Sequence, residues 1–333
     1  MPKEVPTFLD VPTQAGVINL SQAHDLDATG PVFAEPALIG ASGRRYSLGS
    51  RVTCGSHAWI HAGRRDDLLA VAIKRLNSLS GYPVGQFSQE GLLHSRLTGV
   101  PGLLPLLDTV QVQGQPALVF PWRSRTLEAM GGQPWDELRP LLAQLARCLI
   151  AMHGQGVVHR DVNPVNILLN EGADNSLGME VELADLGLAI DLGESFATSA
   201  AISIWPTPGF HPPASLAHPG PAMDSYGLAA TAWWLVTGSV PVTGAGGRSL
   251  PSLYPGGNPL SPSGPPNLLE DIACWLNSSA PLVEILPWLD GRCDRLVPER
   301  QRWLPLGSLA SLILLQGMLV LLGWMRRWLN LPG

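Results

Sequence analysis

Lysine is nearly absent from this 333-residue chain: of its 21 basic residues, only Lys3 and Lys74 are lysines. Charged residues make up 14% of the sequence, and the formal net charge at pH 7 is -6. A domain that binds nucleic acid usually carries clustered Lys and Arg, so we expect no nucleic-acid partner. Because lysine is so rare, the single internal lysine, Lys74, calls for a chemical explanation.

Cysteine is also scarce, and its spacing excludes two classes of site. The four cysteines lie far apart and form no CxxC pair, which predicts neither a disulfide framework nor a zinc site. The N-terminal sequence has no basic start followed by an apolar core, so it is not typical of a secretory signal peptide. We therefore expect the main domain to lie in the cytoplasm.

Apolar residues make up 45% of the chain, which predicts a globular protein with a substantial core. Residues 1–42 lack periodicity and are expected to form a poorly ordered leader. Strand-like runs broken by glycine and charged turns follow and predict a small antiparallel sheet. Helical periodicity comes afterwards, most clearly from Trp135 to His153. This order predicts an α+β domain over residues 43–300.

The last long apolar stretch, residues 303–325, contains 23 residues without a charge and has arginines on both sides. At about 1.5 Å per residue, a helix of this length can cross a hydrocarbon core of about 30 Å. We expect a single-pass, C-terminal transmembrane helix followed by a short basic tail, residues 326–333. A buried terminal helix is the alternative, because Gly and Ser residues dilute the apolarity of the segment.

Five residues whose side chains could take part in catalysis occur in a set order along the chain. Lys74 ends the motif VAIK, and Glu90 lies in the next predicted helix. The motif HRDVNPVN contains Asp161 and Asn166, and ADLG contains Asp185. Phosphoryl transfer from ATP needs a cation near the phosphates, oxygen ligands for magnesium and a carboxylate near the acceptor hydroxyl. The five residues supply each of these groups.

Together these motifs resemble the eukaryotic-type protein kinase family, most closely its bacterial Ser/Thr members, over about residues 44–240. The resemblance implies a two-lobed α+β fold, with an antiparallel N-lobe at residues 43–122 and a mainly helical C-lobe at residues 123–300. It implies a membrane-anchored serine/threonine kinase that uses ATP and Mg²⁺ and acts on protein substrates. The implied catalytic residues are Asp161, Lys74, Asn166 and Asp185, with Asn166 and Asp185 as metal ligands; the implied ATP-binding residues are Gly49, Gly55, Ala72, Lys74, Glu90, Phe120 and Trp122.

Two further segments extend the resemblance. TPGFHPP, residues 207–213, looks like the end of an activation loop, and DSYGLA, residues 224–229, looks like the start of the large buried helix. In the family, the acidic residue at the start of this helix braces the catalytic loop. The resemblance implies the same role for Asp224.

The chain departs from the family pattern at three places. Arg51 interrupts the glycine-rich loop, Asn163 stands where a lysine is usual, and Ala214 replaces a glutamate. Loss of the lysine should slow phosphoryl transfer on the order of a hundredfold. The departures keep a second hypothesis open, a nucleotide-binding pseudokinase scaffold. The intact metal and acceptor groups favour an active kinase.

Overall fold

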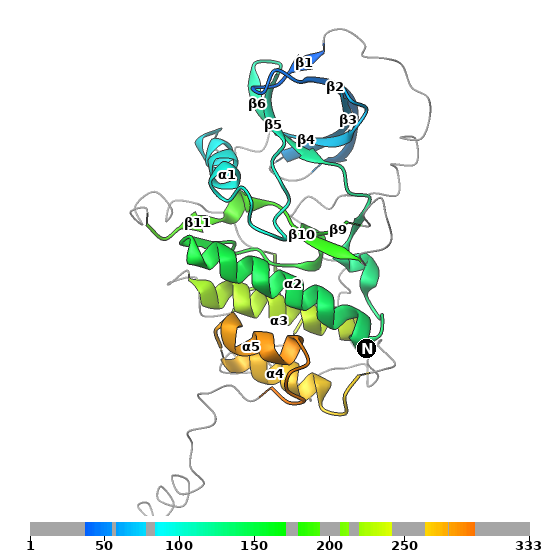
Figure 1. The fold of residues 1–333 in the computed structure, drawn as a ribbon, viewed down its shortest axis with the longest axis vertical. Coiled ribbons are helices and arrows are strands. Elements are labelled where there is room, and N and C mark those ends of the chain that lie inside the picture. Colours follow the sequence, from blue (N-terminus) through cyan, green and yellow to red (C-terminus); the bar gives the residue numbers. More distant parts are fainter. Residues whose placement is uncertain are drawn as a thin grey trace, which may run out of the picture.

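The chain folds into two lobes, a curved β-sheet at the top of Figure 1 and a group of helices below it. The computed structural model describes residues 37–54, 58–77, 84–170, 179–193, 207–212, 220–241, 264–278 and 280–296. The predicted α+β architecture, with the antiparallel sheet first and the helices after it, is confirmed.

Six antiparallel strands form the upper sheet in the order β1-β2-β3-β4-β6-β5. Side chains alternate between the two faces of a strand. In β4, Val71 and Ile73 are fully buried in an apolar cluster on one face, so Ala72 and Lys74 point to the opposite face. The strands are β1 (Leu38–Ile39), β2 (Arg45–Cys54), β3 (Ala58–Arg65), β4 (Ala70–Leu76), β5 (Asp108–Val112) and β6 (Gln115–Pro121).

One helix, α1 (Val84–Arg96), lies beside the sheet (Figure 1). Its buried residues include Phe87, Glu90, Leu93 and His94, which share one helical face at spacings of three and four. Phe87 belongs to the same apolar cluster as Leu118 of β6. This packing turns Glu90 toward the sheet.

The lower lobe is built around α2 (Trp135–Gly154) and α3 (Pro221–Thr237), with α4 (Leu268–Ser278) and α5 (Leu282–Leu289) beneath them (Figure 1). Every residue of α3 from Met223 to Thr237 is buried. A helix that is covered on all sides must be mostly apolar, and the sequence AATAWWLV meets that requirement. Gly238 ends α3 in the left-handed conformation, with φ of 70°.

Short strands and 3-10 helices between the lobes carry the polar motifs. Pairing of Ile167 with Leu183 holds β9 against β10, and the Ala184 N–H donates to the Asn166 carbonyl at 2.8 Å. This hairpin therefore brings Asn166 beside Asp185. The short elements are β7 (Arg125–Thr126), β8 (Val157–Val158), β9 (Ile167–Asn170), β10 (Glu180–Leu183), β11 (Ile190–Asp191), η2 (Leu127–Met130), η3 (Pro164–Asn166) and η4 (Leu186–Leu188).

The folded domain begins before residue 43, which corrects the expected boundary of the leader. β1 pairs with β2, and Asp108 of β5 accepts hydrogen bonds from Ser42, through both its backbone N–H and its hydroxyl, and from Tyr46. A two-residue strand has no periodicity of its own, so the sequence could not signal it. Residues 37–42 are thus part of the sheet lobe, and the rest of the expected leader lies outside the described residues.

The predicted transmembrane segment, residues 303–325, and the basic tail, residues 326–333, also lie outside the described residues. Within the ranges that the structure does describe, no helix has both the length and the apolarity needed to cross a bilayer.

Candidate active site

The loop between β8 and β9 holds the two side chains of the HRDVNPVN motif together. The Asn166 amide donates to one carboxylate oxygen of Asp161 at 2.8 Å and to the Asp161 carbonyl at 3.0 Å. The other carboxylate oxygen of Asp161 accepts the Thr207 N–H at 2.9 Å. Asp161 is therefore fixed from both sides, by its own loop and by the segment that begins TPGF.

Asn163 caps the short helix η3 that carries Asn166. Its side-chain oxygen accepts the N–H groups of Val165 and Asn166 at 3.0 and 3.2 Å, as expected of an N-cap asparagine. Its amide donates to the Asp161 carbonyl and to the Thr207 hydroxyl, both at 3.1 Å. The side chain is almost fully buried, so this position contributes structure rather than a positive charge.

Asp224 of α3 contacts the start of the same loop, in agreement with the bracing contact that the family resemblance implies. Its carboxylate accepts the N–H groups of His159 and Arg160 at 2.9 and 2.7 Å. His159 in turn accepts the Asp161 N–H at Nδ1, and its Nε2 lies 3.0 Å from the Ala184 carbonyl. His159 thereby connects the catalytic-loop motif to the ADLG motif.

Lys74 lies at the centre of the second half of the site. Its Nζ donates to Glu90 at 2.7 Å and to Asp185 at 2.9 Å. β4 supplies the lysine, α1 supplies the glutamate, and the residue before η4 supplies the aspartate. The structure thus brings together residues from both lobes that lie 16 and 111 positions apart.

The electrostatics of this trio follow from burial and mutual attraction. Burial by itself lowers the pKa of Lys74, but the Asp185 and Glu90 carboxylates outweigh that effect and raise it above its ordinary value. Burial opposes ionisation of Asp185 as well, and the Lys74 ammonium overcomes it and lowers the Asp185 pKa to about 2. Burial raises the pKa of Glu90, and the Lys74 charge limits that rise. Lys74 and Asp185 are therefore both charged at neutral pH.

An apolar surface adjoins Lys74 on the same face of the sheet. Ala72 is directly opposite Ala62 of β3 and Phe120 of β6 in the strand register, and cross-strand partners share a face. Ala72 and Phe120 pack in one cluster with Leu168 of β9, from the other lobe. The small side chains of Ala62 and Ala72 leave this part of the sheet flat.

The sequence did not identify three residues of the apolar surface beside Lys74: Ile60, Ala62 and Leu168. Ile60 is directly opposite Lys74 in the strand register. Counting the register back from the charged turn at Asp66 and Asp67 would have put Ile60 and Ala62 on the face of Lys74. Leu168 could have been found from its position two residues after Asn166, where the alternation of the following strand begins.

The segment after β6 leaves the sheet next to Phe120. The Trp122 N–H donates to the Ala70 carbonyl at 3.1 Å, which extends the pairing with β4 by one residue. Arg123, also missed by the sequence analysis, makes a two-point contact with Glu182 of β10 at 2.8 and 2.9 Å. This ion pair fixes the connection between the lobes immediately after Trp122.

Of the two glycines expected above the phosphates, only one belongs to the connection between β2 and β3. Gly49 lies inside β2, where the register shifts between Leu48 and Arg51. A Cβ on Gly49 would lie 2.8 Å from the Ala62 carbonyl oxygen, so close strand packing explains this glycine. Gly55 falls in the connection, residues 55–57, which is outside the described residues.

The third departure from the family pattern, Ala214, lies outside the described residues as well. A glutamate at that position usually pairs with a later arginine. In the helical lobe, Arg295 donates to Asp271 of α4 at 3.0 Å. Asp271 is 1% exposed, so the arginine compensates a buried charge within the helical lobe.

The donor set near Asp185 fits a hard divalent cation. Lys74 and Gly187 both donate to the same oxygen of Asp185, and within the described ranges the Asn166 side chain bonds only through its amide nitrogen. One carboxylate oxygen and one amide oxygen remain, and Mg²⁺ prefers such oxygen ligands completed by phosphates and water. No cluster of three or more His, Cys, Asp or Glu side chains suited to a metal occurs among the described residues.

Comparison with known proteins agrees with this geometry. A family model described as "Protein kinase domain" matches residues 48–251, more than half of the chain. The chain belongs to the protein kinase domain family. The matched range contains Lys74, Glu90, Asp161, Asn166 and Asp185.

Several relatives carry serine/threonine kinase names. "Serine/threonine-protein kinase PknK" of Mycobacterium tuberculosis is 35% identical over 178 residues, which are 51% of this chain and 15% of PknK. "Serine/threonine-protein kinase PkaA" of Streptomyces coelicolor is 31% identical over 248 residues, 72% of this chain and 44% of PkaA. "Cell division control protein 2 homolog 3" of Trypanosoma brucei brucei is 27% identical over 235 residues, 65% of this chain and 72% of that protein. The chain thus covers less than half of each of these bacterial relatives.

Proposed function

We propose that this chain is a protein serine/threonine kinase that transfers the γ-phosphate of ATP to Ser or Thr hydroxyls of protein substrates and requires Mg²⁺. The observation that carries the proposal is the contact of Lys74 with both Glu90 and Asp185, together with the contact of Asn166 with Asp161. Names of the bacterial relatives support the choice of Ser/Thr substrates.

Each group has a role that its chemistry allows. Lys74 would bind ATP phosphates, and Asn166 and Asp185 would hold Mg²⁺, which neutralises charge on the transferring phosphate. Asp161 would orient the acceptor hydroxyl and accept its proton. The flat face at Ala62 and Ala72 and the apolar Leu168 suit an adenine ring between the lobes, while Gly55 would cover the phosphates and Trp122 would lie beside the base.

Replacing Asp161 tests the proposal. We expect Asp161→Asn to lower phosphate transfer from radiolabelled ATP to a generic protein substrate by about 10²–10⁴-fold, because proton acceptance is lost. ATP binding should persist, since Lys74 is unchanged. Asp136→Asn, an exposed change in α2, serves as the control. Equal rates for wild type and Asp161→Asn would refute the kinase assignment.

A nucleotide-binding pseudokinase scaffold is the second candidate, and the burial of Asn163 favours it. No lysine is available at that position, and the Asn163 side chain is engaged with Asp161 and Thr207. A wild-type chain that binds ATP but transfers no phosphate with either Mg²⁺ or Mn²⁺ would support this candidate. Turnover that depends on Asp161 would exclude it.

The proposal includes a membrane location. Residues 303–325 carry no charge and have arginines on both sides, so they would form a single-pass C-terminal anchor with the kinase domain in the cytoplasm, where ATP is available. Cell fractionation would compare the full chain with a chain that lacks residues 303–333. We expect only the full chain to stay in the membrane fraction after a carbonate wash; a soluble full chain would overturn the anchor.

A further inference from the structure

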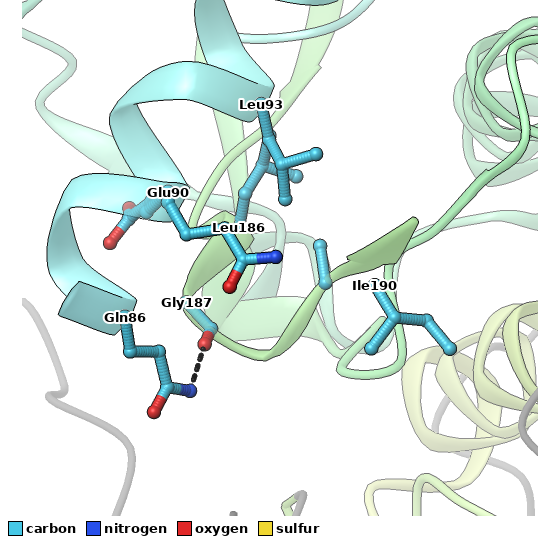
Figure 2. A pocket seen from close by; sticks show the side chains of 8 residues that line it. Gln86, Glu90, Leu93, Leu186, Gly187 and Ile190 are labelled. Atoms are coloured by element: carbon cyan, nitrogen blue, oxygen red, sulfur yellow. Dashed lines mark hydrogen bonds between the residues drawn. The ribbon is translucent and has the colours of Figure 1, made fainter. Parts of the chain in front are cut away.

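Helix α1 contacts the ADLG turn at a second point, one helical turn before Glu90. Figure 2 shows the Gln86 amide directed at Gly187. The Gln86 amide nitrogen donates to the Gly187 carbonyl at 2.9 Å. The Gly187 N–H in turn donates to Asp185 Oδ1 at 3.0 Å. Gly187 therefore links Gln86 to the proposed metal ligand through its own backbone groups.

These bonds form a closed ring. Asp185 Oδ1 also accepts from Lys74, which donates to Glu90, and Glu90 is four residues after Gln86 on the same helical face. The ring passes from α1 through β4 to the turn at Asp185 and returns to α1 through Gly187. A shift of α1 would therefore disturb Asp185 at two points, through Lys74 and through Gly187.

The ring of hydrogen bonds helps to hold the backbone conformation of Asp185. Asp185 has φ of 66° and lies in the left-handed region, which is less favourable for an aspartate than for a glycine. Such a conformation persists when surrounding contacts hold it. The Gly187 N–H bond and the Lys74 bond act on the Asp185 side chain, and Gln86 acts on the turn that follows it.

Among the described residues, the Gln86 amide bonds through its nitrogen. Its oxygen is buried and has no hydrogen-bond partner within the part of the chain that the structure describes. Gln86 lines a cavity of about 10 Å³ together with Gln89, Leu93, Leu186 and Ile190 (Figure 2). That volume corresponds to about one water molecule. The hydrogen bond that Gln86 makes with the turn is therefore the one that its amide nitrogen donates to Gly187.

We propose that Gln86 is a positioning residue that holds the turn 185–187 in the conformation that binds Mg²⁺ together with ATP. The inference rests on the proposed kinase function and adds to it a residue that touches neither the nucleotide nor the metal. It predicts that the identity of residue 86 sets how much Mg²⁺ strengthens ATP binding.

Nucleotide binding by the full chain tests the inference without relying on turnover. The affinity for ATP would be measured by calorimetry with excess Mg²⁺ and again with EDTA. Gln86→Met keeps the length of the side chain and removes the donor; we expect it to weaken binding with Mg²⁺ by about three- to tenfold, as loss of one hydrogen bond implies, and to leave binding in EDTA unchanged. Gln86→Lys restores a donor and should recover most of the loss.

Two further measurements distinguish a specific effect of the Gln86 donor from a general effect of changing the cavity. Gln89→Met makes the same chemical change in the same cavity and should leave the effect of Mg²⁺ unchanged. Hydrogen exchange of residues 184–190 in the nucleotide-free protein should become faster in Gln86→Met and not in Gln86→Lys. Equal Mg²⁺ dependence in wild type and Gln86→Met would overturn the role of Gln86 alone. A wild-type chain that binds no ATP under either condition would overturn the kinase proposal itself, and the inference with it.

Discussion

Asp224 accepts the backbone N–H of Arg160 at 2.7 Å from a position that is fully buried in α3. Arg160 has φ of 70°, a left-handed conformation that is unfavourable for a residue with a side chain. The second oxygen of Asp224 accepts the His159 N–H, and His153 of α2 lies 2.8 Å from the same oxygen. One carboxylate thus holds the strained start of the catalytic loop against two helices.

Asp224→Asn should therefore destabilise the domain. The amide keeps a single acceptor oxygen and turns an NH₂ group toward N–H donors, so at least one buried donor loses its partner. We expect the free energy of unfolding in urea to fall by about 1–3 kcal/mol, with a larger relative loss of phosphate transfer. Asp136→Asn, an exposed change in α2, should stay within about 0.5 kcal/mol of wild type; an equal effect of both changes would contradict the bracing role.

Asn163 offers a prediction that separates capping from charge. Asn163→Ala removes the cap of η3 and should lower the free energy of unfolding by about 1–2 kcal/mol. Asn163→Ser keeps a capping oxygen but loses the amide that donates to Asp161 and Thr207, so we expect a smaller loss. Urea unfolding of both variants checks the order. If Ser is as destabilising as Ala, the cap is not what Asn163 contributes.

The sequence was informative where chemistry depends on motif order. Lys74, Glu90, Asp161, Asn166 and Asp185 could be selected because phosphoryl transfer needs those groups, and the structure brings them together. Asn163 was expected to matter only through a missing charge. Its capping role depends on the rotation of its side chain into the loop, which no spacing rule reveals.

Features that depend on strand register could not be predicted from the sequence. Gly49 is expected to be part of a phosphate-binding loop, and the structure adds a second reason for a glycine there: it packs closely against β3 where the pairing of β2 with β3 shifts. The apolar face at Ala62 and Leu168 joins strands from two lobes, and local alternation does not reveal which strands meet. Tertiary contacts likewise determine that His94, a polar residue in α1, is buried.

Lys74→Met should impair nucleotide binding and leave Glu90 buried without its partner. Hydrogen bonds to charged groups contribute about 1.5–3 kcal/mol, so we expect ATP affinity to fall by roughly ten- to a hundredfold. In Lys74→Met with Glu90→Gln, the loss of affinity should be smaller than the sum of the two single losses, because the residues share one contact. Additive losses, measured by calorimetry, would show that Glu90 does not act through Lys74.

Stability should also depend on pH through His94, which packs edge-on against Phe120 with ring centroids 4.9 Å apart. Burial lowers the pKa of His94 to about 3, and the Lys74 ammonium adds to the effect. The folded protein therefore holds His94 neutral, whereas the unfolded chain protonates it near its ordinary value of 6.5. The unfolded state binds more protons between these values, so the contribution of His94 is complete above pH 6.5 and is lost as the pH falls.

His94→Leu should remove this dependence, because leucine has a similar apolar volume and no proton to gain. Wild type should lose about 2 kcal/mol of unfolding free energy between pH 7 and pH 5 from His94 alone, so the difference between wild type and His94→Leu should shift by that amount in favour of the variant at pH 5. Urea unfolding at the two pH values measures it. Since other titrating groups are common to both chains, parallel pH profiles would mean that His94 is protonated equally in the folded and unfolded states.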